Sequence, residues 1–200
     1  MTKLAEDVAK ALLKVKAVFL RPSDPFTWAS GIKSPIYCDN RIVLGYPDVR
    51  EVIEKGIVET IKAKFPDCEI LMGTATAGIP HAAIAATILN MPMGYVRADA
   101  KSHGRNNKIE GANPKGKKVV VIEDLISTAG SSIEVVEALR EAGADVLGIV
   151  SIFTYNLKKG KIRLAEANVK NVSLSNFETL AKVALEENYV NEKEYKMLLK

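Results

Sequence analysis

The chain of 200 residues lacks the features that mark several classes of protein. Its two cysteines, Cys38 and Cys68, form no C-x-x-C pair, which argues against a zinc ribbon, a thioredoxin motif and a disulfide framework. No apolar run follows the first charged residues, so we expect no signal peptide. The net charge of +4 is too small to indicate nucleic-acid binding. These absences predict a cytoplasmic protein with reduced thiols and no nucleic-acid partner.

One segment has the length of a membrane span. Residues 70–96 contain no Lys, Arg, Asp or Glu, and about 20 apolar residues suffice to cross a bilayer. However, three glycines and two prolines interrupt this segment, which divides it into strand, loop, helix and strand. We therefore expect buried core and no membrane partner. With 48% hydrophobic and 26% charged residues, the composition is that of a globular protein, and the length predicts one domain over residues 1–200.

The remaining pattern alternates between apolar strands and amphipathic helices. Strands are expected at 69–72, 93–97, 118–123 and 145–155, and helices at 3–17, 47–65, 79–89, 131–142 and 175–188. This alternation predicts an α/β fold with a doubly wound, mostly parallel sheet flanked by helices. Residues 19–45 break the alternation, and we expect them to form a small N-terminal hood that contains a strand at 36–43.

Three local signals complete this prediction. Ser175 to Glu178 has the form of a capping box, and Asn191 is expected to cap a last short helix. Residues 98–116 are polar and aperiodic, which indicates a loop. His81, on an Ala-rich helix, is interpreted as a structural histidine, and both cysteines as inert small hydrophobes.

The strongest chemical signal is the segment 119–132, VVVIEDLISTAGSS. An apolar strand runs into Glu123 and Asp124, and small and hydroxyl residues then lead into a helix. Free backbone N–H groups at a helix N-terminus bind anions, and hydroxyls add donors to phosphate oxygens. The acids suit a polyol or a metal ion, so the segment predicts a sugar-phosphate site. The alternative is an ordinary capped strand–turn–helix. The segment is neither a Walker A loop nor a G-x-G-x-x-G motif, which disfavours nucleotide triphosphatases and dinucleotide folds.

Two further loops fit a polyanionic substrate. Residues 97–118 hold seven Lys or Arg against Asp99 and Glu110, and His103 is suited to donate a proton near neutral pH. A solvated basic loop is the alternative. Residues 73–80 also join a strand to a helix, where backbone N–H groups bind diphosphate or where small residues merely allow tight packing.

These segments resemble a known family. Glu-Asp-Leu-Ile-Ser-Thr-Ala-Gly-Ser, at 123–131, resembles the phosphoribosyl diphosphate (PRPP) motif of type I phosphoribosyltransferases. Residues 26–41 resemble the hood of the orotate phosphoribosyltransferases, and residues 97–104 resemble the mobile catalytic loop of the same family. The resemblance covers nearly the whole chain. It implies Mg²⁺-dependent transfer of ribose 5-phosphate from PRPP to orotate, in a homodimer whose subunits share active sites.

The resemblance also implies roles for individual residues. The PRPP-binding set would be Arg97, Lys101, His103, Glu123, Asp124, Leu125, Ile126, Ser127, Thr128, Ala129, Gly130 and Ser131. The catalytic roles would belong to Lys101, His103 and Asp124. Orotate would contact Ser127, Lys33 and Tyr37. Mg²⁺ would be held mainly through PRPP, with Glu123 and Asp124 nearby.

The chain departs from the family pattern at a few positions. Ala77 stands where some members carry a lysine, so residues 73–80 are expected to bind diphosphate only through the main chain. Ala98 replaces a lysine that some members carry in the catalytic loop, which reduces the number of cations expected there. Ala29 also replaces a lysine, and Cys38 interrupts a pair of aromatic residues. Two other assignments remain open: a purine phosphoribosyltransferase, which should lack this hood, and a PRPP-sensing regulator, which usually adds a DNA-binding domain or loses the catalytic loop.

Overall fold

The computed structural model describes residues 1–29, 31–98 and 108–199. Internal contacts divide the chain into two compact units. The first unit comprises Met1–Ile53 and Ser175–Lys200, and the second comprises Glu54–Leu174. The predicted hood, residues 19–45, belongs to the first unit, and the three loops singled out for their chemistry belong to the second.

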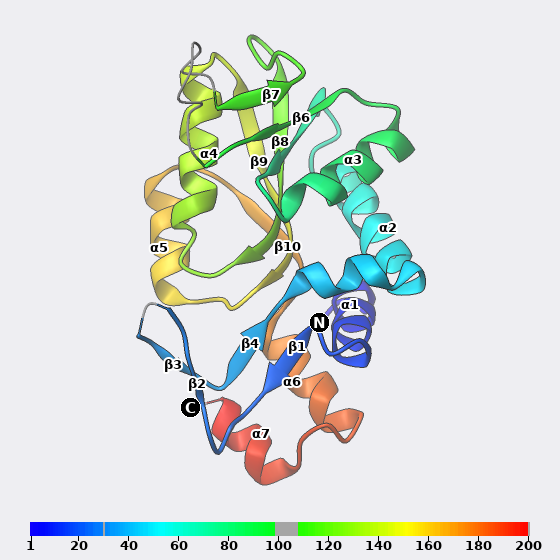
Figure 1. The fold of residues 1–200 in the computed structure, drawn as a ribbon, viewed down its shortest axis with the longest axis vertical. Helices are drawn as coiled ribbons and strands as arrows, with labels where there is room; N and C mark the ends of the chain where they lie inside the picture. The colour runs from blue at the N-terminus through cyan, green and yellow to red at the C-terminus, as the bar shows by residue number, and fades with distance from the viewer. Residues whose placement is uncertain (30, 99–107, 200) are drawn as a thin grey trace. The chain divides into compact units, whose positions relative to one another are not determined.

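A mostly parallel sheet forms the centre of the second unit (Figure 1). Among the described residues it has six strands, in the order β10-β9-β8-β5-β6-β7. The strands are β5 (Ile70–Thr74), β6 (Met93–Val96), β7 (Ile109–Gly111), β8 (Lys118–Ile126), β9 (Asp145–Thr154) and β10 (Asn171–Asn176). The pairs β5–β6, β5–β8 and β8–β9 are parallel, whereas β6–β7 is antiparallel. The expected α/β fold class is confirmed.

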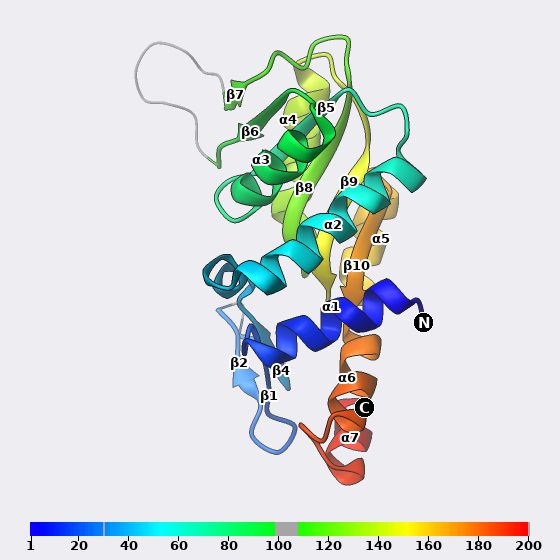
Figure 2. The same ribbon diagram turned by 90° about the vertical axis from the view of Figure 1, so that its right-hand side faces the viewer.

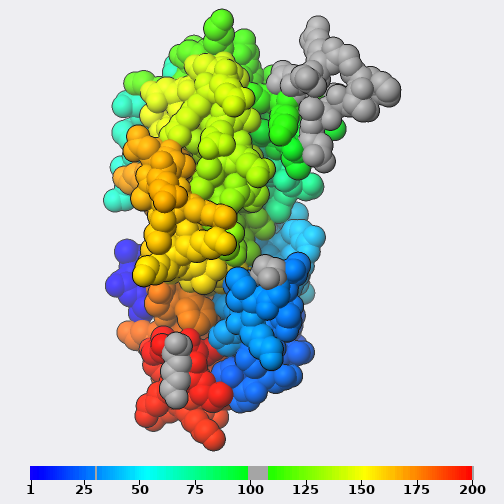
Figure 3. All heavy atoms as spheres, turned by 90° about the vertical axis from the view of Figure 1, so that its left-hand side faces the viewer, coloured from blue at the N-terminus to red at the C-terminus, as the bar shows by residue number. Residues whose placement is uncertain are grey.

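Helices cover both faces of this sheet, as a doubly wound fold requires (Figure 2). One face carries α4 (Gly130–Glu141) and α5 (Lys158–Glu166), which Figure 3 shows in space-filling form. The other face carries α3 (Gly78–Leu89) and the part of α2 (Pro47–Lys64) that begins at Glu54. No helix within the described ranges is long and apolar enough to cross a membrane.

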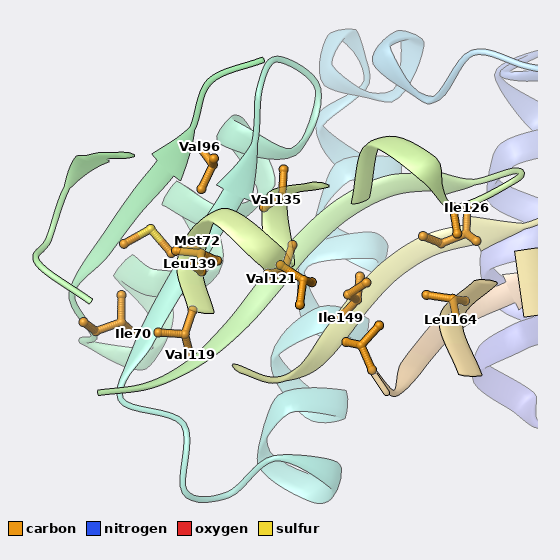
Figure 4. Packing of buried hydrophobic residues seen from close by; sticks show 13 residues of the cluster. Ile70, Met72, Val96, Val119, Val121, Ile126, Val135, Leu139, Ile149 and Leu164 are labelled. Atoms are coloured by element: carbon orange, nitrogen blue, oxygen red, sulfur yellow. The ribbon is translucent and has the colours of Figure 1, made fainter. Parts of the chain in front are cut away.

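The core under α4 explains why the central strands are so apolar. Val119, Val120, Val121 and Ile122 of β8 are all completely buried, because helices cover the sheet on both sides. Figure 4 shows the cluster on one of these faces, to which β5, β6, β8, β9, α4 and α5 all contribute side chains. Burial of this kind stabilises by about 25 cal/mol for each Å² of apolar surface, so this core holds the central strands and α4 together.

The first unit consists of packed helices and two short antiparallel strand pairs. Helix α1 (Lys3–Lys14) packs on α6 (Phe177–Glu186), and α7 (Glu192–Leu198) follows. In the hood, β1 (Val18–Leu20) pairs with β4 (Ile36–Cys38), and β2 (Phe26–Thr27) pairs with β3 (Lys33–Ser34). The predicted cap of the last helix is confirmed, since Asn191 forms a capping box with Glu194.

Four expectations about elements were wrong. The strand predicted at 36–43 ends at Cys38, and a 3-10 helix, η1 (Asn40–Gly45), replaces its second half under an Asp39 cap. The loop predicted at 98–116 contains β7. The capping box predicted from Ser175 is shifted by one residue, because Asn176 is the N-cap and the Ser175 hydroxyl donates to the carbonyl of Ala5.

The fourth difference bears on the candidate site. The strand predicted at 118–123 continues through both acids to Ile126, because Leu125 and Ile126 stay paired with β9. Glu123 and Asp124 therefore lie within β8, near its carboxyl end, and the pairing of β8 with β9 holds their backbone in place.

Candidate active site

A pocket of about 300 Å³ lies at the carboxyl edge of the sheet in the second unit. Three strand ends contribute to it, with Thr74 from β5, Arg97 from the residue after β6, and Glu123 and Asp124 from β8. Ser131 and Glu134 of α4 line it as well. Ligands of doubly wound sheets bind at this edge, so the pocket is the expected place for chemistry.

Glu123 is the most constrained side chain of the pocket. It is only 6% exposed, and both its carboxylate oxygens accept hydrogen bonds. Oε1 accepts from the Thr74 hydroxyl at 2.8 Å and from the backbone N–H of Asp124 at 2.9 Å, while Oε2 accepts from the Ser132 hydroxyl at 2.8 Å. Glu123 thus connects the end of β5 with the first turn of α4.

The surroundings of Glu123 also change its acidity. Burial, with the Asp124 carboxyl as a second cause, raises the pKa of Glu123 from its ordinary 4.5 to about 7. The hydroxyls of Ser132 and Thr74 act in the opposite direction because they stabilise the charged form. Near neutral pH, Glu123 therefore carries less negative charge than an exposed glutamate would.

Asp124 is more accessible than Glu123. It is half-buried and lines the same pocket. Its carboxylate can accept hydrogen bonds from a polyol or provide oxygen ligands to a hard cation such as Mg²⁺. Within the parts of the chain that the structure describes, no group of three or more His, Cys, Asp or Glu could hold a metal ion. Asp124 is the side chain that could offer oxygen to a cation bound together with a substrate.

The segment 127–131 forms the turn from β8 into α4. Helix α4 begins at Gly130, and its N-cap, Ala129, makes no side-chain cap hydrogen bond. Ala129 has φ +65°, in the left-handed region that costs a residue with a Cβ about 1–2 kcal/mol. The turn is thus held in a conformation that local preference disfavours, with the N–H groups of the first turn of α4 available to an anion.

A second pocket of about 300 Å³ lies beside this turn. Ile126 and Ser127 line it together with Thr154, Asn156 and Lys161. Ile126 is 2% exposed and belongs to the core, so its side chain is not available to a ligand. Of the predicted PRPP set, the first pocket brings together Arg97, Glu123, Asp124, Leu125 and Ser131, whereas Ser127 lies at the second.

Glycine is required where the β5–α3 loop passes β8. A Cβ on Gly78 would lie 2.3 Å from the carbonyl oxygen of Ile122 and 2.5 Å from the Thr74 hydroxyl. This close approach allows Thr74 to reach Glu123 and brings the loop residues Ala75, Thr76 and Ala77 to the wall of the first pocket. Residues 73–80 thus pack closely against β8 at Gly78, and Ala75 to Ala77 line the pocket. Binding of diphosphate by this loop stays a prediction.

The basic residues predicted around the pocket are described only in part. Arg97 is half-buried, and its Nη1 lies 3.7 Å from Oε1 of Glu110. Lys108 also lines the first pocket. Lys101 and His103 lie outside the described residues. Lys33 and Tyr37 belong to the first unit, with Tyr37 42% exposed, and their contact with orotate stays a prediction.

Sequence reasoning missed two partners within the site. Thr74 and Ser132 were not selected as site residues, yet both hydroxyls donate to Glu123. The available signal was that each hydroxyl lies in a segment already expected to bind phosphate groups, Thr74 in residues 73–80 and Ser132 in residues 119–132. His81 is buried and its Nδ1 pairs with Oε1 of Glu54, as expected for a structural histidine. Cys38 and Cys68 are buried and form no disulfide, and burial raises the pKa of Cys68 to about 11.

Comparisons with known proteins agree with this geometry. The family model of the phosphoribosyl transferase domain matches residues 46–188, so the chain belongs to the phosphoribosyltransferase family. The orotate phosphoribosyltransferase of Listeria innocua is 60% identical over 187 residues, which cover 94% of this chain and 90% of that protein. The orotate phosphoribosyltransferase of Bacillus cytotoxicus is 58% identical over 195 residues, which cover 98% of this chain and 93% of that protein. Within the family, the chain groups with the orotate phosphoribosyltransferases.

A solved structure supports the same grouping. The crystal structure of orotate phosphoribosyltransferase from Aeropyrum pernix matches with a TM-score of 0.78 at 30% identity, over 92% of this chain and 99% of that chain. The resemblance stated from the sequence is thereby confirmed.

Proposed function

We propose that the protein transfers ribose 5-phosphate from PRPP to orotate and releases orotidine 5′-monophosphate and diphosphate, a step of pyrimidine (UMP) biosynthesis. The observation that carries the proposal is the first pocket, where the Asp124 carboxylate and the N-terminus of α4 lie at one sheet edge. An acid for ribose hydroxyls beside N–H groups for a phosphate is what a sugar-phosphate donor needs. The identity to relatives named orotate phosphoribosyltransferase gives the base.

The donor would be bound along the strand ends. Ser127 to Ser131 would hold the 5-phosphate with hydroxyl and backbone donors, and Asp124 would accept hydrogen bonds from the ribose. The main chain of residues 75–77, which line the pocket, would face the diphosphate. Arg97 and Lys108 also line this pocket.

The reaction needs no side-chain nucleophile. In the proposed mechanism N1 of orotate gives up its proton and forms a bond to C1 of the ribose, while the bond from C1 to the diphosphate breaks. The transition state resembles an oxocarbenium ion. The protein then acts by holding both reactants and by stabilising the charge of the departing diphosphate. Lys101 and His103 are proposed to meet that diphosphate, with His103 as the proton donor.

Mg²⁺ is proposed as the cofactor. When bound, it would neutralise the diphosphate oxygens and polarise the bond that breaks. Asp124 is the accessible oxygen donor for it, and Glu123 lies behind with its oxygens engaged by Thr74 and Ser132. Because the described residues offer no cluster of three metal-binding side chains, PRPP itself would supply most ligands.

The remaining expectations concern the oligomeric state, the location in the cell and the residues that contact orotate. We propose a homodimer in which Arg97, Lys101 and His103 of one subunit serve the site of the other, and a cytoplasmic location. Lys33 and Tyr37 of the hood, with Ser127, are proposed to contact the carboxylate and ring of orotate.

The direct test follows the ultraviolet absorbance of orotate in the presence of PRPP and Mg²⁺. We expect orotate to disappear with release of one diphosphate for each orotate consumed, and we expect a chelator to stop the reaction until Mg²⁺ is restored. Consumption of orotate that persists in excess chelator would remove the metal from the proposal. No consumption under any of these conditions would refute the proposed function.

A further inference from the structure

We propose that Arg163 of α5 is a positioning residue that holds the phosphate-binding turn, residues 127–131, from the side that faces α5, and that it supplies the positive charge that this turn lacks. The inference rests on the proposed function, because it concerns how the turn binds the 5-phosphate of PRPP. The turn itself contains only serine, threonine, alanine and glycine. A phosphate monoester carries a charge of about −1.5 to −2 near neutral pH, so a cation close to the turn would strengthen its binding.

Helix α5 lies against the backbone of this turn. A Cβ on Gly160 would be 2.6 Å from the carbonyl oxygen of Ser127, so the close approach requires a glycine. One helical turn further along α5, Nη1 of Arg163 lies 3.5 Å from the carbonyl oxygen of Thr128. The same nitrogen lies 3.3 Å from the point that a Cβ on Gly130 would occupy. The guanidinium is therefore beside the middle of the turn, where α4 begins.

These two contacts determine where the N–H groups of the turn point. In a trans peptide, the carbonyl and the N–H of the next residue point in opposite directions. Because the carbonyls of Ser127 and Thr128 are directed at α5, the N–H groups that follow them point away from α5. Consecutive N–H groups on one side of a turn form a concave anion site, to which the left-handed φ of Ala129 contributes. Arg163 thus stabilises the arrangement that offers these donors to a phosphate.

The charge of Arg163 accounts for more of the expected effect than its hydrogen bond. A separation of 3.5 Å is long for a hydrogen bond, whereas electrostatic attraction declines more slowly with distance. Arg163 is half-buried, and solvent screens a half-buried charge less than an exposed one. Glu137 and Glu166 line the same hollow and would offset part of this charge, but the guanidinium meets the turn directly.

Binding of ribose 5-phosphate tests the inference without any assay of activity, because this probe carries the 5-phosphate and no diphosphate. The measurement is isothermal titration calorimetry. In Arg163→Met, which keeps an unbranched side chain but removes the charge, we expect the dissociation constant to rise roughly ten-fold. In Arg163→Lys, which keeps the charge, we expect a rise of no more than about three-fold. A purely structural role in packing would not distinguish these two variants in this way.

Arg140 of α4 offers a matched control. Its guanidinium also joins α4 to α5, because it donates to the carbonyls of Ala167 and Asn168 at 2.7 and 2.9 Å, just beyond the C-terminal end of α5. Arg140→Met therefore removes the same charge and a contact between the same helices, but at a distance from the turn. We expect it to lower Tm at least as much as Arg163→Met and to leave the affinity for ribose 5-phosphate unchanged.

The outcomes that would overturn the inference are specific. If Arg163→Met binds ribose 5-phosphate as tightly as wild type, the guanidinium does not support the turn. An equal loss of affinity in Arg140→Met would show a general loosening of the two helices instead. If wild-type protein does not bind ribose 5-phosphate at all, the turn is not a phosphate site and the inference is wrong.

Kinetics separate the inference from the proposed function. We expect Arg163→Met to raise KM for PRPP roughly ten-fold and to leave kcat and KM for orotate near their wild-type values. An unchanged KM for PRPP would contradict the inference while orotate is still consumed. Wild-type protein that binds ribose 5-phosphate but consumes no orotate would refute the proposed function, and the binding experiment would still decide the role of Arg163.

Discussion

Gly78 is a position at which one added methyl group should be strongly destabilising. In Gly78→Ala the new Cβ would lie 2.3 Å from the Ile122 carbonyl oxygen and 2.5 Å from the Thr74 hydroxyl. Favourable contacts of carbon lie near 3.5–4.0 Å, so the start of α3 must move by about 1 Å. Overpacking costs about 1–3 kcal/mol, and displacement of the Thr74 hydroxyl from Glu123 adds about 1.5 kcal/mol or more.

We therefore expect Gly78→Ala to lower the free energy of unfolding by about 3 kcal/mol. For a chain of this length, that corresponds to a decrease in Tm of roughly 10 °C. The assay is thermal denaturation followed by circular dichroism. The matched control is Gly45→Ala, because a Cβ there meets nothing within 4 Å, and its Tm should stay within a few degrees of wild type. Equal melting of the two variants would show that α3 does not approach β8 this closely in solution.

Three further predictions concern the acids and the dimer. Asp124→Asn should lower kcat/KM at least about a hundred-fold with Tm unchanged, whereas near-wild-type turnover would remove its proposed contact with ribose or metal. When the variants Lys101→Ala and Asp124→Asn are refolded together with complete subunit exchange, about a quarter of wild-type activity should return. The reason is that half the dimers are mixed and each mixed dimer has one intact site. Activity equal to the sum of the two single variants would show that the loop serves the site of its own subunit. Because the pKa of Glu123 rises from 4.5 to about 7 on folding, the native protein keeps a proton that the unfolded chain releases, so the contribution of Glu123 to stability should fall as pH rises through that window. Glu123→Gln should lack this fall, with a difference of about 3 kcal/mol developing by pH 8 in metal-free buffer; parallel pH profiles would contradict the raised pKa.

Much of the sheet was predictable because its signal is local. The run of β-branched residues at 119–122 is buried on both faces, and its pattern alone identified the central strand. The end of that strand was not predictable in the same way. In the sequence, the two acids after the apolar run suggest that the strand ends there. Leu125 and Ile126 nevertheless stay in the strand because they pair with β9, which begins only at Asp145.

Long-range contacts also decided the details that the sequence left unresolved. Ser175 fits a capping box, yet its hydroxyl is committed to the carbonyl of Ala5, 170 positions away, and Asn176 caps the helix instead. The same holds within the site. Thr74 and Glu123 are 49 positions apart, and only the parallel pairing of β5 with β8 brings them together. The sequence motif was therefore enough to predict where the pocket lies. The residues that hydrogen-bond to Glu123 could be identified only from the register of the strands in the sheet.

Orotate is the base that we propose this enzyme accepts. The most direct measurement compares kcat/KM for orotate with the values for uracil, hypoxanthine and adenine, at fixed PRPP and Mg²⁺. Uracil is the sharpest comparison because it lacks only the carboxylate of orotate, and a site that binds a charged group discriminates strongly against an analogue without it. We expect efficient use of orotate and little or no use of the other three bases. Efficient use of hypoxanthine or adenine without orotate would contradict it and would make the protein a purine phosphoribosyltransferase.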